Sequence, residues 1–274
     1  MPEMPEVETI RRQLADKLLG HTIMDMDIRL SRLFKWPEAS EVKAHLIHQT
    51  IVAVTRRGKY LLFTLSNEKI LVVHLRMTGR LLYQAKQEQE DAYTRIVFYL
   101  ENKHVLIYAD TRTLGTLYVM SEPELARISG LATMGPEPCS AGFTREYLSR
   151  GLAKRHGNLK ALLLNQQFIG GLGNIYVDEC LAVAGISPER KASSLLGCEV
   201  DKLYEAVNRV IQEGLEDGGT TFRDYQNSEG KSGSHQDRLW VYDRTGQPCR
   251  RCGTAIMKKV VAGRGTHYCP HCQH

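Results

Sequence analysis

The chain has 274 residues, which is enough for one large domain or two ordinary domains, each with its own hydrophobic core. Hydrophobic residues make up 42% and charged residues 24% of it, and the net charge is +5, as in many soluble globular proteins. No apolar run approaches the roughly 20 residues that cross a bilayer, and the first residues, MPEMPEVET, are acidic rather than an apolar leader. We therefore expect a cytoplasmic protein without a membrane partner.

The first part of the chain is predicted to be one helix followed by many strands. Residues 5–18 place Val7, Ile10 and Leu14 on one helix face, with acidic residues in the first turn, where the helix dipole favours them. Short segments rich in β-branched and aromatic residues follow, separated by polar or glycine-containing turns, which is typical of a β-sandwich or barrel. The expected strands are Ile51–Thr55, Tyr60–Leu65, Ile70–Leu75, Arg95–Leu100, Val105–Ala109 and Thr116–Met120.

The pattern changes near Gly135-Pro136-Glu137-Pro138, a turn-rich stretch that indicates a boundary or linker. Beyond it the apolar spacing becomes helical, and roughly the last 40 residues return to short strands and tight turns. The expected helices lie near 144–153, 157–167, 175–184, 192–195 and 199–216.

Four of the seven cysteines form two closely spaced pairs. An odd number of cysteines without a secretion signal argues against a disulfide framework. Cys249-x2-Cys252 and Cys269-x2-Cys272, separated by sixteen residues, place four thiolates on two tight turns, a spacing typical of zinc. Four protein ligands leave no open coordination position, so we expect one structural Zn2+ and no catalytic metal. Alternative ligands nearby are His267, His271 and His274.

The charges in the last part of the chain carry one sign. No acidic residue follows Asp243, whereas six basic residues do. Such a module suits a polyanion such as DNA, although a solvated basic tail has the same composition. The six residues are Arg244, Arg250, Arg251, Lys258, Lys259 and Arg264.

A glycine-rich turn separates two helix candidates in the second half. Leu159–Phe168 is followed by Ile169-Gly170-Gly171-Leu172-Gly173-Asn174, and the second helix begins there. Glycines let the backbone approach a ligand closely, and the free N–H groups of a helix start favour an anion, to which Asn174 can add a side-chain donor. The alternative, which spacing leaves open, is a tight turn between packed helices.

Six segments in a fixed order form a specific combination: PEMPEVET at 2–9, RGKY at 57–60, HLRM at 74–77, GLGNIY at 171–176, GGTTFRDY at 218–225 and VAGRGTHYCP at 261–270. Over essentially the whole chain they resemble the formamidopyrimidine-DNA glycosylase family. The resemblance implies a multidomain α+β protein with DNA bound in the cleft between its domains. These are an N-terminal helix with a β-sandwich (1–134), a helix–two-turn–helix domain (135–235) and a C-terminal zinc ribbon (236–274).

The resemblance also implies that the secondary amine of Pro2 is the nucleophile, once Met1 has been removed, as is expected when proline follows it. An α-amino group titrates near about pH 8, so part of it is neutral near neutral pH. Attack on the sugar C1′ expels the base and leaves a cationic iminium, which permits elimination of the 3′ and then the 5′ phosphate. Glu3 is the candidate general acid/base, and Glu6 is expected to order the same helix start.

Other matching residues are implied to hold the DNA. Lys59 and Arg264 match family residues at the phosphates of the reacting nucleotide, and His74 and Asn174 match further phosphate contacts. The target base must leave the stack, and apolar side chains commonly fill the hole. The matching void-filling residues are Met77, Arg112 and Leu114, of which Arg112 would face the cytosine opposite the lesion.

The glycine-rich segment 218–225 resembles the lesion-recognition loop of the family, whose backbone N–H groups would surround O6 of the purine. An ordinary flexible loop has a similar composition. Its residues are Gly218, Gly219, Thr220, Thr221, Phe222, Arg223, Asp224 and Tyr225.

Two positions depart from the family's pattern. Thr78 stands where the family usually has a glutamate that frames the lesion pocket, and Leu114 stands where it has phenylalanine. Leucine remains apolar but cannot stack on a base as an aromatic ring does. We therefore expect an active enzyme with altered discrimination between lesions or opposite bases.

The sequence thus predicts a monomeric, bacterial-type enzyme of base-excision repair. It would remove 8-oxoguanine and formamidopyrimidines from duplex DNA and cleave abasic sites. Two alternatives stay open. An endonuclease VIII-like enzyme would prefer oxidised pyrimidines. Arg112 and the loop 218–225 favour the purine specificity over this alternative, whereas Thr78 and Leu114 weaken it. A non-catalytic protein that binds damaged DNA would need neither Pro2 nor Glu3.

Overall fold

The computed structural model describes residues 2–222 and 225–274 of the chain. The chain forms two compact units, and the segment that follows the last long helix returns to the N-terminal one. We call them the sandwich unit, Met1–Ala132 with Asp217–Ser234, and the helical unit, Thr133–Glu216 with His235–His274.

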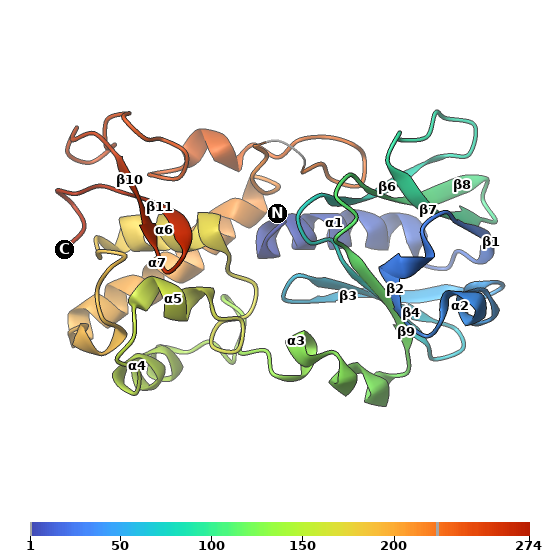
Figure 1. The fold of residues 1–274 in the computed structure, drawn as a ribbon, viewed down its shortest axis with the longest axis horizontal. Helices are drawn as coiled ribbons and strands as arrows, with labels where there is room; N and C mark the ends of the chain where they lie inside the picture. The colour runs from blue at the N-terminus through green and yellow to red at the C-terminus, as the bar shows by residue number, and fades with distance from the viewer. Residues whose placement is uncertain (1, 223–224) are drawn as a thin grey trace. The chain divides into compact units, whose positions relative to one another are not determined.

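The sandwich unit contains two β-sheets (Figure 1). Its strands are β1 Ile23–Ile28, β2 Phe34–Trp36, β3 Ile51–Arg57, β4 Tyr60–Leu65, β5 Ile70–His74, β6 Gly79–Ala85, β7 Thr94–Leu100, β8 His104–Asp110 and β9 Thr116–Met120. One sheet has four strands in the order β1-β7-β8-β6, and the other has five in the order β2-β9-β5-β4-β3. All neighbours are antiparallel except β2 and β9, which are parallel.

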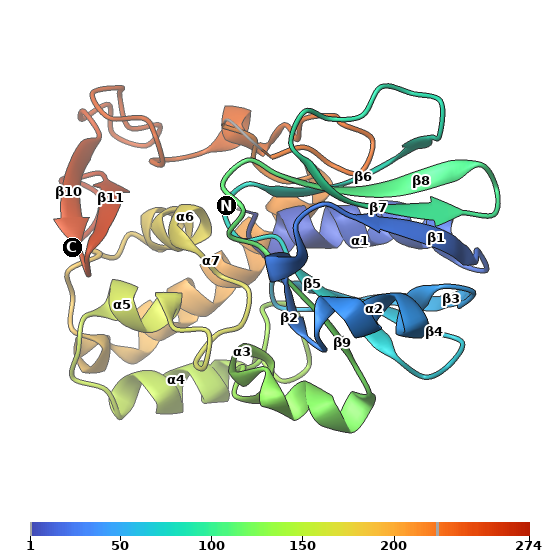
Figure 2. The same ribbon diagram turned by 45° about the vertical axis from the view of Figure 1, so that its right-hand side comes forward.

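The first helix, α1 (Met4–Leu18), lies between the two sheets (Figure 2). Ile10 and Leu14 are fully buried in one cluster with Phe63 of β4 and Phe98 of β7, so the helix completes the core that the sheets enclose. Each such side chain contributes about 1.5–3 kcal/mol by leaving water. The unit's short helices are η1 Ser31–Leu33, α2 Ala39–Leu46, η2 Glu122–Arg127 and α3 Ser129–Ala132.

The helical unit combines packed helices with one hairpin. Its elements are α4 Arg145–Ala153, α5 Leu159–Leu164, α6 Asn174–Ala184, η3 Ala192–Ser194, α7 Gly197–Glu216, η4 His235–Arg238, β10 Met257–Val261 and β11 Arg264–Tyr268. The side chains of Thr144 and Asn158 accept backbone N–H groups at the starts of α4 and α5. Such caps stabilise a helix by about 1 kcal/mol.

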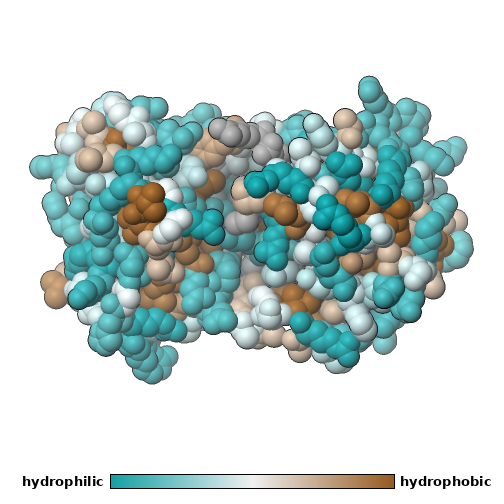
Figure 3. Space-filling view, viewed as in Figure 1, coloured by the Kyte–Doolittle hydropathy of each residue, from teal (hydrophilic) through white to brown (hydrophobic). Residues whose placement is uncertain are grey.

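The helix predicted for residues 5–18 and the six predicted strands are confirmed, with ends that shift by one or two residues. The structure adds β1, β2, β6 and α2, which the sequence pattern did not indicate. Within the described ranges, no helix has the length and apolar character needed to cross a membrane. On the face shown in Figure 3, apolar side chains gather in separate patches among hydrophilic ones.

Candidate active site and DNA interface

The N-terminal end of α1 carries the predicted nucleophile and general acid/base. Pro2 and Glu3 are both buried within the sandwich unit. The backbone N–H of Glu3 donates to Oε2 of Glu6 at 2.7 Å, and the two residues form a reciprocal capping box. This cap fixes the direction in which the chain enters α1, so Pro2 and Glu3 are held on an ordered helix start.

The Glu6 carboxylate also holds the glycine-rich loop that the resemblance assigns to lesion recognition. Its Oε1 accepts the backbone N–H of Thr220 at 2.6 Å. At Gly219 the φ angle is +87°, and a Cβ there would lie 2.8 Å from Cγ of Glu6, so only glycine fits. The hydroxyl of Tyr225 donates to the carbonyl of Gly218 at 3.1 Å and closes the loop. One buried carboxylate thus connects the start of α1 to this loop.

The remaining loop residues are only partly described. The Thr221 hydroxyl donates to the carbonyl of Tyr225 at 3.2 Å, and Phe222 is exposed. Arg223 and Asp224, which we also assigned to the loop, lie outside the described residues, as does Met1.

Lys59 lies in the tight turn between β3 and β4, where the sequence places it, and is buried. Arg56 connects this turn to α1, since it donates to Oε2 of Glu8 at 3.1 Å and to the carbonyl of Gly58 at 2.8 Å. Burial raises the pKa of Glu8, but hydrogen bonds from three arginines outweigh it and lower that pKa overall. Glu8 therefore stays ionised, and the Lys59 turn is fixed to the helix that begins beside Pro2.

His74 ends β5 and is buried, with its ring edge-on to Tyr60 at 4.5 Å between centroids. Its Nδ1 accepts the backbone N–H of Arg76 at 3.0 Å, so the neutral ring carries its proton on Nε2. Burial, together with the charges of Arg76 and Lys59, lowers the pKa of His74 to about 3. Any contact of His74 with a phosphate is therefore made by a neutral N–H donor.

This burial of neutral His74 predicts a specific loss of stability in acid. The unfolded chain binds the proton near about pH 6.5, whereas the folded chain binds it only near pH 3. The unfolded state therefore holds more protons between these values, and stability falls as the pH drops. From about pH 7 to about pH 5, the wild type should lose about 2 kcal/mol more than His74→Gln. Denaturant unfolding of both proteins measures this, and equal losses would contradict it.

The three predicted void-filling residues lie on two neighbouring turns of the sandwich unit. Met77 is 39% exposed between β5 and β6, and Leu114 is 47% exposed between β8 and β9, on the same turn as the exposed Arg112. Gly79 and Asp110, which flank the two turns, are paired across β6 and β8. The turns therefore lie side by side at one end of the sandwich.

In the helical unit, Asn174 begins α6 directly after the glycine turn. Gln166 shapes this turn, because it accepts the N–H of Gly171 at 3.0 Å and donates to the carbonyl of Leu172 at 2.7 Å. The Asn174 Nδ2 donates to the carbonyl of Gly265 at 2.9 Å. An amide nitrogen carries two hydrogens, so the second can donate to a phosphate oxygen.

A buried ion pair fixes the hairpin strand that begins at Arg264. Lys160 and Asp178 both have fully buried side chains, and Nζ lies 2.6 Å from Oδ1. The Lys160 Nζ also donates to the hydroxyl of Thr266 at 2.7 Å, and Oδ2 of Asp178 accepts the backbone N–H of His267 at 2.9 Å. Since Thr266 and His267 belong to β11, helices α5 and α6 hold this strand from inside the unit.

The next residue of α6 holds the segment that precedes the hairpin. Glu179 is buried and accepts three consecutive backbone N–H groups at 2.6, 3.0 and 2.8 Å, from Trp240, Val241 and Tyr242. Burial raises the pKa of this carboxyl and outweighs those hydrogen bonds. Glu179 thus positions the chain just before the cysteine pairs.

Sequence reasoning missed Lys160, Asp178, Glu179 and Gln166. A signal was present for the first three, because charged residues inside apolar helical stretches are seldom buried unless they are paired. Gln166 offered no such signal, since a glutamine before a turn is common on protein surfaces.

The four predicted zinc ligands gather at one point of the helical unit. Their sulfur atoms all lie within 4.8 Å of one another. The Cys249–Cys272 and Cys252–Cys269 pairs are separated by 3.9 and 3.5 Å. Tetrahedral Zn–S bonds of about 2.3 Å place sulfurs about 3.8 Å apart, so the set fits one structural Zn2+. In the described part of the chain, no histidine joins this group.

Removing the zinc is expected to unfold the hairpin and its flanking turns. Zinc contributes about 10–16 kcal/mol to the folding of isolated fingers, and four thiolates without it repel or oxidise. Metal analysis should find one zinc per chain, and chelation should lower the melting temperature until zinc is added back. A zinc-free protein with an unchanged melting temperature would contradict this assignment.

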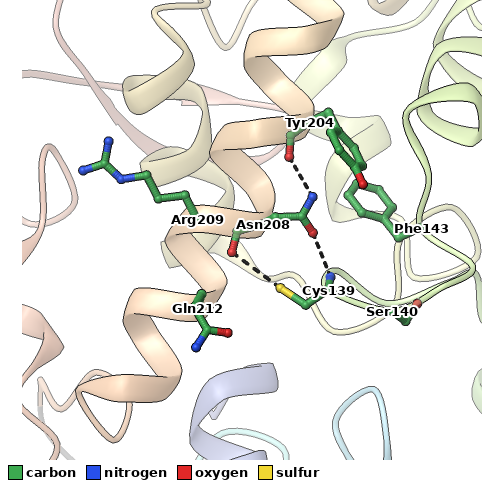
Figure 4. A pocket seen from close by; sticks show the side chains of 7 residues that line it. All are labelled: Cys139, Ser140, Phe143, Tyr204, Asn208, Arg209 and Gln212. Atoms are coloured by element: carbon green, nitrogen blue, oxygen red, sulfur yellow. Dashed lines mark hydrogen bonds between the residues drawn. The ribbon is translucent and has the colours of Figure 1, made fainter.

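A separate cavity of about 450 Å3 lies in the helical unit (Figure 4). Asn208 of α7 bridges it, since its side chain accepts the N–H of Cys139 and donates to the carbonyl of Tyr204. Burial raises the pKa of the Cys139 thiol, which keeps it protonated and unreactive near neutral pH. The lining contains no carboxylate or imidazole and none of the predicted site residues, so the cavity is not the catalytic site.

Three family models match this chain in order. The formamidopyrimidine-DNA glycosylase N-terminal domain matches residues 1–117, and the H2TH domain of the same glycosylase matches residues 134–226. The zinc finger found in FPG and IleRS matches residues 246–274, which contain the four-cysteine group. A sandwich, an H2TH domain and a zinc finger in this order define a DNA glycosylase of base-excision repair.

Comparisons with individual proteins agree with the family models. The formamidopyrimidine-DNA glycosylase of Pelotomaculum thermopropionicum is 46% identical over 273 residues, covering 100% of this chain and 99% of that protein. A Lactococcus lactis Fpg variant in complex with Fapy-dG-containing DNA matches with a TM-score of 0.93, 35% identity and 99% coverage of both chains. The wild-type L. lactis protein with DNA containing an oxidised pyrimidine matches at 0.92, with 34% identity and 99% coverage of both chains. The chain therefore belongs to the formamidopyrimidine-DNA glycosylase family.

Membership in the family confirms the fold, the repair-glycosylase activity and the zinc finger that the sequence predicts. The roles of individual site residues and the boundaries of the three domains stay predictions.

Proposed function

We propose that this enzyme excises oxidised purines from duplex DNA and then cleaves the strand, with the secondary amine of Pro2 as its nucleophile. One observation carries the proposal. The Glu6 carboxylate accepts N–H groups from both Glu3 and Thr220, and so links the helix start beside Pro2 to the loop assigned to the damaged base. A protein that only bound DNA would not need this link.

The chemistry follows from a neutral secondary amine. After removal of Met1, the lone pair of Pro2 attacks C1′, the bond from C1′ to the base breaks, and the base takes a proton from Glu3. The proton of the Pro2 nitrogen then passes to O4′ as the C1′–O4′ bond breaks, which opens the sugar ring and forms an iminium that acidifies C2′. Loss of a C2′ proton breaks the C3′–O bond, and a second elimination breaks the C5′–O bond. Water then hydrolyses the iminium and releases Pro2.

The DNA contacts come from both units. We assign Lys59 and His74 of the sandwich unit, and Asn174 and Arg264 of the helical unit, to phosphates. The local structure around each residue supports this assignment, because each is held by the turn, strand or helix start described above. Phosphate contacts set the position of a protein on DNA, whereas contacts with bases select the site. The base-contacting residues would be the exposed Met77, Arg112 and Leu114.

A more specific proposal concerns the lesion that the enzyme prefers. The L. lactis complex with Fapy-dG favours a purine-derived lesion for this chain as well. The complex of the same relative with an oxidised pyrimidine favours a second candidate, a broader activity that includes pyrimidines. We further propose that the enzyme acts as a cytoplasmic monomer.

The test uses three labelled duplexes, which contain 8-oxoguanine, thymine glycol or an abasic site. Products are separated with and without alkali, because alkali cleaves abasic sites and so separates base loss from strand cleavage. A third portion is treated with borohydride, which reduces an iminium to a stable protein–DNA adduct. We expect cleavage without alkali and an adduct on the 8-oxoguanine and abasic duplexes.

Other outcomes decide between the alternatives. Cleavage of the thymine glycol duplex but not of the 8-oxoguanine duplex would select the pyrimidine-specific reading. Binding without an adduct on any duplex, by protein shown to lack Met1, would refute the enzymatic proposal.

A further inference from the structure

The turns that carry Met77 and Arg112 both cross between the two sheets of the sandwich. The first leaves β5 of the five-stranded sheet and enters β6 of the four-stranded sheet. The second leaves β8 of the four-stranded sheet and returns to β9 of the five-stranded sheet. Contacts between these turns therefore decide how their exposed tips stand relative to each other.

Asp110 lies where the turns meet and is fully buried. Its Oδ1 accepts the Thr78 hydroxyl at 2.6 Å and the Arg112 backbone N–H at 3.1 Å. Its Oδ2 accepts the Tyr108 hydroxyl at 3.1 Å and the Gly115 backbone N–H at 2.9 Å. One carboxylate thus holds the Arg112 turn at both of its ends, with charge-assisted hydrogen bonds.

Thr78 connects this carboxylate to the other turn. Its hydroxyl donates to Asp110 and also accepts the backbone N–H of Arg112 at 3.0 Å, which a hydroxyl can do at once. The side chain is buried. A glutamate at position 78, which the family pattern led us to expect, would place a second carboxylate against Asp110 and could not donate while ionised. The threonine is therefore matched to Asp110 in this chain.

We propose that the hydrogen-bonded pair Thr78 and Asp110 sets the selectivity of the enzyme for the base opposite the lesion. The inference rests on the proposed function, in which Arg112 faces that base. Hydrogen bonds weaken steeply as their angle and length depart from the optimum, so a guanidinium discriminates between bases only if its backbone is fixed. The Thr78–Asp110 pair fixes the backbone of Arg112, because it gives the Arg112 N–H two acceptors and connects the Arg112 turn to the Met77 turn. Thr78 and Asp110 are thus positioning residues.

The test compares Thr78→Val with Thr78→Ser and with Thr116→Val. Valine keeps the shape of threonine but removes the hydroxyl, whereas serine keeps the hydroxyl. Thr116 is a matched control, because it is buried at the start of β9 and its hydroxyl has no partner among the residues that the structure describes. For each protein, kcat and KM are measured on duplexes with 8-oxoguanine opposite cytosine and opposite adenine, together with the free energy of unfolding.

We expect the preference of kcat/KM for cytosine over adenine to fall about tenfold in Thr78→Val, the effect of losing one hydrogen bond to a charged group. Thr78→Ser and Thr116→Val should keep the wild-type preference. A merely structural role would lower both rates equally and leave their ratio unchanged, and that result in Thr78→Val would overturn the inference, as would a wild type without any preference. A wild type inactive on both duplexes would instead refute the proposed function.

Discussion

Replacing Glu6 by glutamine is expected to slow base excision about 10- to 100-fold while sparing strand cleavage at a preformed abasic site. The Glu6 carboxylate accepts two backbone N–H groups at 2.7 and 2.6 Å, from Glu3 and Thr220. A glutamine side chain offers one oxygen and one NH2 group. Glutamine serves as well as glutamate in a capping box, so its oxygen should stay with Glu3.

The NH2 group then faces the N–H of Thr220, and two donors cannot pair. A buried donor left without an acceptor costs about 1–3 kcal/mol, so the loop should leave its position. In the proposed function, excision needs the loop to hold the damaged base, whereas lyase action on an abasic site has no base to hold. The measurement is single-turnover kinetics on an 8-oxoguanine duplex and on an abasic duplex.

Two loop variants provide a matched control. Gly218→Ala and Gly219→Ala both place alanine at positive φ, but only a Cβ at position 219 would collide with Glu6, at 2.8 Å. Gly219→Ala should therefore reproduce the Glu6→Gln selectivity, and Gly218→Ala should show only the smaller effect of backbone strain. Equal loss of excision and lyase rates in Glu6→Gln would contradict the link between loop and helix start.

The second large effect is expected from Lys160→Met, which should destabilise the helical unit by about 3–5 kcal/mol. The substitution leaves Asp178 buried without the cation that lies 2.6 Å from it. It also removes the donor to the hydroxyl of Thr266, so β11 should lose its fixed position and DNA affinity should fall with it. The measurement is urea unfolding, followed by the fluorescence of Trp240 in a Trp36→Phe background.

A double-mutant cycle isolates the buried pair. Lys160→Met combined with Asp178→Asn removes both charges, so the double variant should lose less stability than the sum of the two single variants. Arg209→Ala removes an exposed ion pair of similar length, 2.8 Å to Glu213, and should cost no more than about 0.5 kcal/mol. A loss in Lys160→Met as small as that control would show that the pair does not hold the hairpin.

Much of the fold was predictable because local pattern decides it. The aromatic and β-branched content of Tyr60–Leu65 and the apolar face of the first helix are properties of adjacent residues. Strand β1, with the sequence IMDMDI, was missed because its two aspartates are poor strand formers, and pairing with β7 overrides that preference. The return of residues 217–234 to the first unit is a long-range event that no local pattern encodes.

In the candidate site, too, some features were predictable from local sequence and others depended on long-range contacts. The spacing of the cysteine pairs, which the metal dictates, predicted the zinc ligands, and the family resemblance pointed to Pro2 and Glu3 as the proposed catalytic residues. The cap that Glu6 makes at the helix start was expected, but its bond to the loop could not be predicted, because Glu6 and Thr220 are 214 positions apart. The significance of Thr78 was likewise hidden, since only the structure shows that its hydroxyl meets Asp110.

The most direct test of the central claim is to map the covalent adduct. The protein is incubated with an abasic duplex and borohydride and digested with trypsin, and the nucleotide-bearing peptide is sequenced by mass spectrometry. The account predicts the adduct on the proline nitrogen of the peptide formed by residues 2–11, with Met1 absent. An adduct on a lysine such as Lys59, or an N-terminal peptide that still carries Met1 in the trapped complex, would contradict it.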